Sequence, residues 1–173
     1  REGLTARLLD QARVPPRYRK CELDTFVTYP NEKLLAASFF DVGEQTALVC
    51  IDHPQYQKLI VPQLIDIGYK VHLGLFEDDV LLKLATYSYN VVVIYENFKG
   101  ASAGENPILK EMVRRAGLLR REHFVVLLTH RSPTNDAMSA FVQSVDQIVN
   151  IADLANFKPV LRRGVAQHRD LYR

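Results

Sequence analysis

Residues 90–100 read NVVVIYENFKG, and this stretch decides the fold. Its run of four β-branched residues predicts a strand that is covered on both faces, as is typical of parallel sheets. The run gives way to polar side chains, beginning with Tyr95 and Glu96, and then to a Lys-Gly turn. In open parallel sheets, functional side chains lie beyond the carboxyl ends of the strands, so these polar residues mark a candidate site.

Four further apolar runs alternate with helical patterns along the chain. They are TALVCID (46–52), YKVHLGL (69–75), HFVVLLT (123–129) and DQIVN (146–150). Every connection between successive runs is too long for a hairpin, which favours parallel βαβ units. We therefore predict an α/β domain over residues 45–173: a three-layer, doubly wound five-stranded parallel sheet in the order 2-1-3-4-5. Residues 1–44 are expected to form an N-terminal basic arm or extension.

The expected helices follow from capping residues and apolar spacing. Pro54 suits the first turn of a helix that ends at Gly68, and Pro62 is expected to bend or interrupt it. Asn106, followed by proline, is an N-cap for another helix. Within the extension we expect a helix over residues 4–12 and irregular or β structure over residues 26–30.

Two more helices are expected after the fourth strand. One starts near residues 135–136 and is expected to bury Met138, Phe141 and Val142. The last one follows Pro159 and carries apolar residues at helical spacing towards its end. These two helices would flank the fifth strand.

The overall charge balance excludes little, because the 173 residues carry a formal net charge of +2. Residues 1–20 contain six basic and two acidic residues, a local net charge of +4. A solvated linker is the preferred interpretation of this arm, and contact with an acidic partner or polyphosphate is the alternative. Nucleic-acid binding is not expected of the chain.

The cysteine and hydropathy patterns favour a cytoplasmic location. Cys21 and Cys50 fit neither a metal-ligand spacing nor a disulfide framework, which favours the reducing cytoplasm. No apolar run reaches membrane-spanning length, and no signal peptide is visible. Because the chain begins at Arg1 rather than at a methionine, we expect it to be a fragment of a larger bacterial multidomain protein.

The pattern of residues 45–165 resembles the receiver domain of bacterial response regulators, which has a flavodoxin-like fold. Receivers carry an acidic pair after strand 1, a phosphoacceptor aspartate ending strand 3, a hydroxyl ending strand 4 and a lysine after strand 5. By this resemblance Asp52 is one of the acidic pair, with His53 beside it, and Thr129 is the hydroxyl that contacts the phosphoryl group. Tyr95 stands at the acceptor and Asn150 at the lysine, so the resemblance implies a degenerate pocket, a pseudo-receiver.

Glu96 is the nearest substitute for the missing acceptor. Successive strand residues point to opposite faces, so its carboxylate is directed away from the acceptor position unless the strand has already ended. Phosphotransfer is therefore not expected, and neither is a metal site or a cofactor. Binding of Mg²⁺ by Asp52 and Glu96 remains an alternative.

The leading functional hypothesis is a phosphorylation-independent signalling or protein-interaction module, without enzymatic activity, that binds a protein partner or associates with itself. Receivers signal through the face made by their fourth helix, fifth strand and fifth helix. The resemblance maps this possible interaction face to Arg131, Gln143, Gln147, Arg162 and Gln167.

A second hypothesis is a domain that binds a small ligand or a divalent metal, with weak hydrolase activity as one version of it. The residues would be Asp52, His53, Glu96 and His130, which all follow strands at the same edge of the sheet. The preferred interpretation of the two histidines is structural, because their spacing matches no ligand motif. The chain has neither a phosphate-binding loop nor a dinucleotide-binding glycine motif.

Overall fold

A computed structural model of the chain describes residues 44–101, 105–114 and 123–171. The chain divides into two units, Arg1–Val42 and Gly43–Arg173, and the described residues all belong to the second. The predicted helix over residues 4–12 and the structure expected over residues 26–30 lie outside the described residues.

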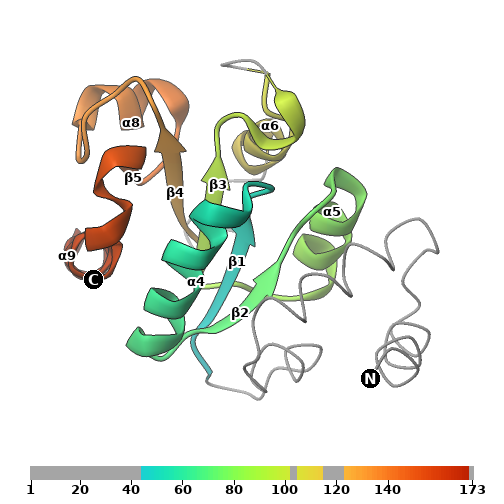
Figure 1. Cartoon of the computed structure of the whole chain (residues 1–173), viewed down its shortest axis with the longest axis horizontal. Coiled ribbons are helices and arrows are strands. Elements are labelled where there is room, and N and C mark those ends of the chain that lie inside the picture. Colours follow the sequence, from blue (N-terminus) through green and yellow to red (C-terminus); the bar gives the residue numbers. More distant parts are fainter. Residues whose placement is uncertain (1–43, 102–104, 115–122, 172–173) are drawn as a thin grey trace. The chain divides into compact units, whose positions relative to one another are not determined.

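The core of the second unit is a single parallel sheet (Figure 1). Its strands are β1 (Thr46–Cys50), β2 (Lys70–Leu73), β3 (Val91–Tyr95), β4 (Phe124–Thr129) and β5 (Gln147–Asn150). All four pairings are parallel, and the strand order is β2-β1-β3-β4-β5. The predicted fold class and strand order are confirmed.

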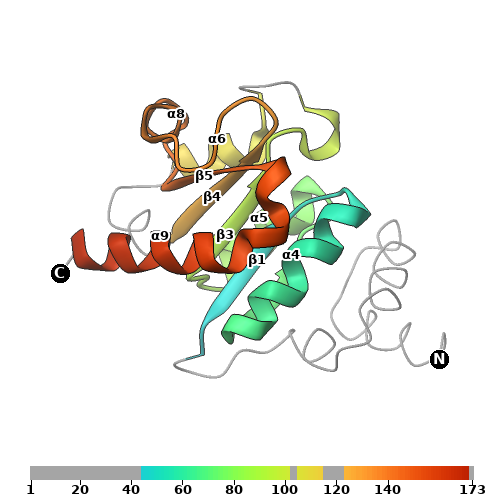
Figure 2. The same cartoon turned by 60° about the vertical axis from the view of Figure 1, so that its left-hand side comes forward.

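Helices cover both faces of the sheet (Figure 2). One layer contains α4 (Pro54–Ile67) and α9 (Phe157–Leu171), which contact each other; the other contains α5 (Glu77–Thr86), α6 (Pro107–Arg114) and α8 (Ala137–Gln143). Two short 3₁₀ segments, η2 (Phe98–Gly100) and η3 (Ile151–Asn156), follow β3 and β5. Both faces of the strands are therefore buried, and Val91, Val92, Val93 and Ile94 have no exposed surface.

The ends of α4 and α6 follow the predicted caps, but the last helix does not begin after Pro159 as expected: α9 begins at Phe157, because a proline is tolerated in the first turn of a helix. Asn106 accepts hydrogen bonds at its Oδ1 from the N–H groups of Ile108 and Leu109, at 3.0 and 3.2 Å, and so caps α6. Gly68 ends α4 in the left-handed conformation, with φ of 113°. The expected interruption at Pro62 was wrong, because α4 continues through it. Pro62 is exposed, so the carbonyl that it leaves without an intrahelical partner is available to water.

The prediction that α8 buries its apolar side chains was wrong. Met138, Phe141 and Val142 are 71%, 81% and 68% exposed, and α8 has no buried residue. The apolar spacing does form a stripe on a helix, but the stripe faces solvent. The physical reason is that α8 has only seven residues and that a cavity, rather than packed side chains, lies between it and the sheet.

The outer edge of β5 is covered by the loop that precedes α8. The N–H of Asn135 donates to the carbonyl of Ile148 at 2.8 Å, and the N–H of Asn150 donates to Oγ1 of Thr134 at 2.9 Å. These bonds use backbone groups that would otherwise be open to another strand. Within the described residues, none of the helices is both long and apolar enough to cross a membrane.

Candidate functional site

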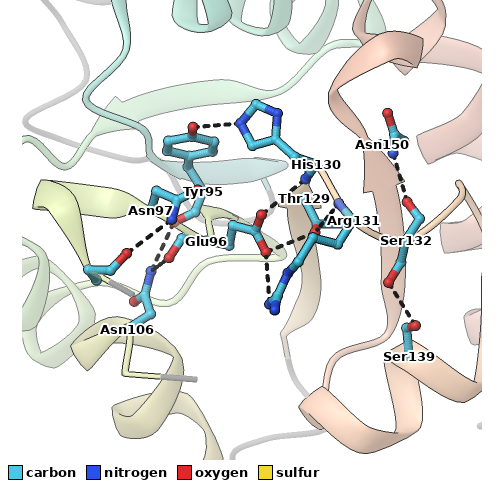
Figure 3. Close-up of polar contacts among 11 residues, drawn as sticks. Tyr95, Glu96, Asn97, Asn106, Thr129, His130, Arg131, Ser132, Ser139 and Asn150 are labelled. Atoms are coloured by element: carbon cyan, nitrogen blue, oxygen red, sulfur yellow. Dashed lines mark hydrogen bonds and ion pairs between the residues drawn. The ribbon is translucent and has the colours of Figure 1, made fainter. Parts of the chain in front are cut away.

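Glu96 is the centre of the polar network at the carboxyl edge of the sheet (Figure 3). The side chain is buried, and its Oε2 accepts a 2.8 Å hydrogen bond from Oγ1 of Thr129. Its Oε1 accepts a 3.0 Å bond from the N–H of His130, and the Arg131 guanidinium lies 3.5 Å from Oε2. The end of β4 and the loop after it therefore supply every one of these donors to a buried carboxylate, which is what such a group needs.

Tyr95 and Glu96 point to opposite faces of the sheet. The Tyr95 hydroxyl lies 2.9 Å from Nε2 of His130, and its ring meets the edge of Tyr56, a residue of α4, with 5.5 Å between ring centroids. Glu96 instead lines a cavity beside α8, on the other face. Burial is the largest of the effects that raise the pKa of Tyr95.

The strand register explains which residue meets Thr129. Tyr95 is aligned with Leu128 of β4, and the N–H of Glu96 continues the pairing by donating to the Leu128 carbonyl at 3.0 Å. Glu96 is consequently next to Thr129, and residues side by side on parallel strands share a face. The carboxylate beside this hydroxyl therefore comes from the residue after the predicted acceptor position.

Asp52 and His53 occupy a separate part of the edge. Oδ2 of Asp52 accepts a 3.0 Å hydrogen bond from the backbone N–H of Lys99, which adopts a left-handed conformation with φ of 56°. The His53 ring stacks on Tyr56 with 3.9 Å between centroids. These contacts link Asp52 to the loop after β3 and His53 to α4, whereas the carboxylate of Glu96 is held by the end of β4 and the loop after it.

Asn150 organises the backbone at the end of β5. Its Nδ2 donates to the carbonyl of Ser132 at 2.9 Å, and its Oδ1 accepts from the N–H of Ala152 at 2.9 Å, which caps η3. In Figure 3 Asn150 lies beside Ser132 and apart from Glu96. The residue at the predicted lysine position therefore joins two loops.

The ligand set of the second hypothesis is divided among these networks. Glu96 is engaged by the end of β4, Asp52 by Lys99, and the His130 ring by Tyr95. Within the described ranges, no group of three or more His, Cys, Asp or Glu side chains is placed to hold a metal ion. Asp52 and Glu96, the two carboxylates of the Mg²⁺ alternative, already accept hydrogen bonds from protein donors.

A cavity of about 270 Å³ lies between α8 and the sheet. Its lining consists of Glu96, Leu127, Thr129, Arg131, Ser132, Met138, Ser139, Val142, Gln143 and Ile148. Sequence reasoning missed this cavity because it assumed that the apolar side chains of α8 fill the space. One signal pointed the other way: α8 reads AMSAFVQ, so its apolar residues are not opposed by a charged face.

The predicted interaction face is only partly on the surface. Arg131, Arg162 and Gln167 are exposed, and Gln143 is partly so. Gln147 was wrongly assigned to this face: it is 5% exposed, and its Nε2 donates to Oδ1 of Asn135 at 2.8 Å and to the Val160 carbonyl at 3.0 Å.

No protein-family model matches the chain, and no curated protein sequence matches it. Solved structures with a similar fold exist. HP1043, an orphan response regulator of H. pylori, is 12% identical with a TM-score of 0.54, and the match covers 71% of this chain and 98% of that one. A sensor protein from Polaromonas sp. JS666 is 15% identical with a TM-score of 0.53, covering 72% and 98%.

A third similar structure is a fusion that contains the yeast Spc42 trimeric coiled coil. It is 14% identical with a TM-score of 0.56, and the match covers 77% of this chain and 84% of that one. At these identities the likeness concerns the fold. The second unit therefore has a flavodoxin-like, receiver-like fold.

Proposed function

We propose that this chain is a receiver-like signalling module that binds a protein partner, or a second copy of itself, without being phosphorylated. The observation that carries the proposal is the 2.8 Å hydrogen bond from Thr129 to the buried carboxylate of Glu96. Because a hydroxyl has one hydrogen to donate, Thr129 cannot keep this bond and also donate to an incoming phosphoryl oxygen.

The surrounding residues support the same conclusion. The N–H of His130 donates to the second oxygen of Glu96, and Oγ1 of Thr129 accepts a 3.1 Å bond from the N–H of Arg131. Glu96 thus gives the loop after β4 the negative charge that a phosphoryl group would otherwise bring. Tyr95 has no carboxylate to phosphorylate, and Asn150 brings no cation. Under this proposal the loop keeps one arrangement, and the surface beside it is presented permanently.

The setting that this proposal implies is the reducing cytoplasm of a bacterium, as part of a larger signalling protein. Buried Cys50 has no exposed surface, and burial raises the pKa of its thiol, so it stays protonated and chemically inert. The proposed module needs neither a cofactor nor a resident metal.

The test is treatment of the full chain with acetyl phosphate and Mg²⁺, followed by intact mass spectrometry. We expect no phosphoryl adduct, while a receiver that has its acceptor aspartate is modified in the same reaction. Backbone amide spectra recorded with Mg²⁺ and beryllofluoride, a phosphoryl analogue, are expected to show no shift at residues 129–132. A stable adduct, or a beryllofluoride-dependent shift there, would overturn the proposal.

A further inference from the structure

The outward stripe of α8 and the cavity beside it form one continuous surface, called here the α8 groove. It consists of Phe141 and the ten residues that line the cavity, among them Met138 and Val142. These three apolar side chains are 68–81% exposed on a helix that contributes no buried residue. Large contiguous apolar patches are uncommon on monomers, and they mark binding sites when a polar rim surrounds them.

The interior of the groove suits an apolar side chain. Its floor is formed by Leu127 and Ile148, which are 3% and 1% exposed, and its wall by Met138 and Val142. The cavity of about 270 Å³ lies at the lower end of the volumes of about 300–1,000 Å³ that are typical of small-molecule sites. A protein segment can place one anchoring side chain in it and cover the exposed stripe of α8 at the same time, which a free ligand of that size cannot do.

The charge at the rim of the groove indicates which charged residue the partner carries beside its apolar anchor. Arg131 is the one cation among the lining residues, and its side chain is 60% exposed. Glu96, the one anion among them, is buried and bonded to Thr129 and His130, and its Oε2 lies 3.5 Å from the Arg131 guanidinium. The helix itself carries no charge. The accessible part of the groove is thus apolar, with the exposed side of one guanidinium at its rim.

We propose that the α8 groove binds an amphipathic segment of a partner protein, in which large apolar residues at helical spacing lie next to an aspartate or glutamate. The apolar anchor enters the cavity, and the carboxylate pairs with Arg131. This inference names the partner chemistry of the proposed interaction module and rests on that function.

The structure disfavours two other occupants. A second copy would bring another uncharged α8, which offers Arg131 no carboxylate, and Asp136 already caps its own helix through Ser139. An added β-strand would need the edge of β5, but Asn135 and Thr134 occupy it. A helix in the groove avoids both difficulties.

The experiment is selection of a random peptide library displayed on phage against the full chain, followed by measurement of the affinity of each enriched peptide for the full chain and for Val142→Glu. We expect enriched peptides to share large apolar residues three or four positions apart beside Asp or Glu. Val142→Glu should weaken their binding about a hundredfold, because it places a charge against the anchor. The matched control Val113→Glu, at a 51% exposed valine of α6 that does not line the groove, should leave affinity unchanged, and circular dichroism confirms that each variant is folded.

The role of Arg131 is measured with a double-mutant cycle that combines Arg131→Gln with replacement of the peptide carboxylate by its amide. We expect each single change to cost about two- to fivefold in affinity, and the second change to cost nothing after the first. Additive losses would remove Arg131 from the proposal.

The remaining outcomes also decide between the possibilities. If no peptide is enriched, or if the enriched peptides bind Val142→Glu as tightly as the unmodified chain, the proposal that the α8 groove binds a partner segment is wrong. A dimer that is detected by sedimentation and abolished by Val142→Glu would assign the groove to a second copy. Each of these results leaves the phosphorylation-independent function standing, because that function is tested separately by acetyl phosphate.

Discussion

The hydroxyl of Thr129 donates a 2.8 Å hydrogen bond to the carboxylate of Glu96, and the two residues are 33 positions apart in the sequence. They meet because β3 and β4 are adjacent and parallel, and because Glu96 continues their register by one residue. The same register sends Tyr95 to the opposite face, towards His130 and Tyr56. One hydrogen bond therefore identifies which side chain occupies the pocket beside α8.

Removing the Thr129 hydroxyl should destabilise the fold. Thr129→Val keeps the shape but withdraws a donor from the buried carboxylate of Glu96, so we expect a loss of about 1–3 kcal/mol in the free energy of unfolding. Urea unfolding measures it. The control is Thr86→Val, at an exposed site in the last turn of α5, where the change should stay within about 0.5 kcal/mol. Equal losses in the two variants would show that the buried network contributes nothing special.

The exposure of α8 predicts an unusual tolerance for loss of an aromatic residue. Phe141→Ala should leave the free energy of unfolding within about 0.5 kcal/mol of the unmodified chain, because 81% of this residue faces solvent. Phe157→Ala, the same substitution at a residue with no exposed surface, should cost about 3–5 kcal/mol. Thermal or urea unfolding distinguishes them. A large loss at Phe141 would mean that its ring is packed in solution.

Gly164 should resist a substitution that usually strengthens helices. Alanine in place of glycine favours an α-helix by about 1 kcal/mol, but a Cβ on Gly164 would lie 2.6 Å from Oε1 of Gln147. Gln147 cannot easily withdraw, because Asn135 and Val160 hold its amide. We expect Gly164→Ala to cost about 1–3 kcal/mol in unfolding experiments.

The control for this steric explanation removes the obstacle. With Gln147→Ala as the background, adding Gly164→Ala should be neutral or stabilising, since the space is then free. If Gly164→Ala is equally costly in both backgrounds, the contact with Gln147 is not its cause.

Stability should fall in acid partly through His72. Burial, with a smaller effect from the charge of Lys83, lowers the pKa of this histidine from 6.5 to about 3. The unfolded chain therefore binds a proton between pH 6.5 and pH 3 that the folded chain does not, so stability decreases as the pH falls through this window. The slope should be at most about 1.4 kcal/mol per pH unit.

Urea unfolding of the unmodified chain and of His72→Gln, measured between pH 7 and pH 4, isolates this contribution. The difference in unfolding free energy between the two should shrink as the pH falls, because glutamine does not titrate. In the fold, His72 shares a 2.6 Å hydrogen bond with the Tyr89 hydroxyl, so the variant should start out less stable at pH 7. A constant difference across the range would contradict the assignment.

Much of the fold could be predicted because its determinants are local. Continuous β-branched runs such as residues 91–94 are stable only when both faces are covered, and connections of helical length between them favour parallel strands. The Asn106 cap and the Gly68 stop also depend on near neighbours. The break expected at Pro62 does not occur. A proline destabilises a helix less at an exposed position such as Pro62, because water can bond the carbonyl that is left without an intrahelical donor.

The candidate site was less predictable, because it depends on register and direction. Thr129, Tyr95 and Glu96 could all be placed at one edge of the sheet from the sequence. Which of the latter two meets Thr129 depends on a shift of one residue, and such a shift exchanges the two faces. Asn150 was located correctly at the end of β5, but its contacts with Ser132 and Ala152 arise from loops whose paths no periodicity encodes.

By itself, therefore, the sequence determined the parallel sheet, its strand order and the edge at which the polar residues gather, because hydrophobic patterning and connection length are properties of the chain. Only the tertiary structure decided that Glu96 rather than Tyr95 shares a pocket with Thr129, and that the apolar stripe of α8 faces outward. An apolar helical stripe shows that one side of a helix prefers to leave water, but not what covers it. In the described part of this chain, Met138, Phe141 and Val142 stay largely exposed, beside a cavity that opens onto Arg131.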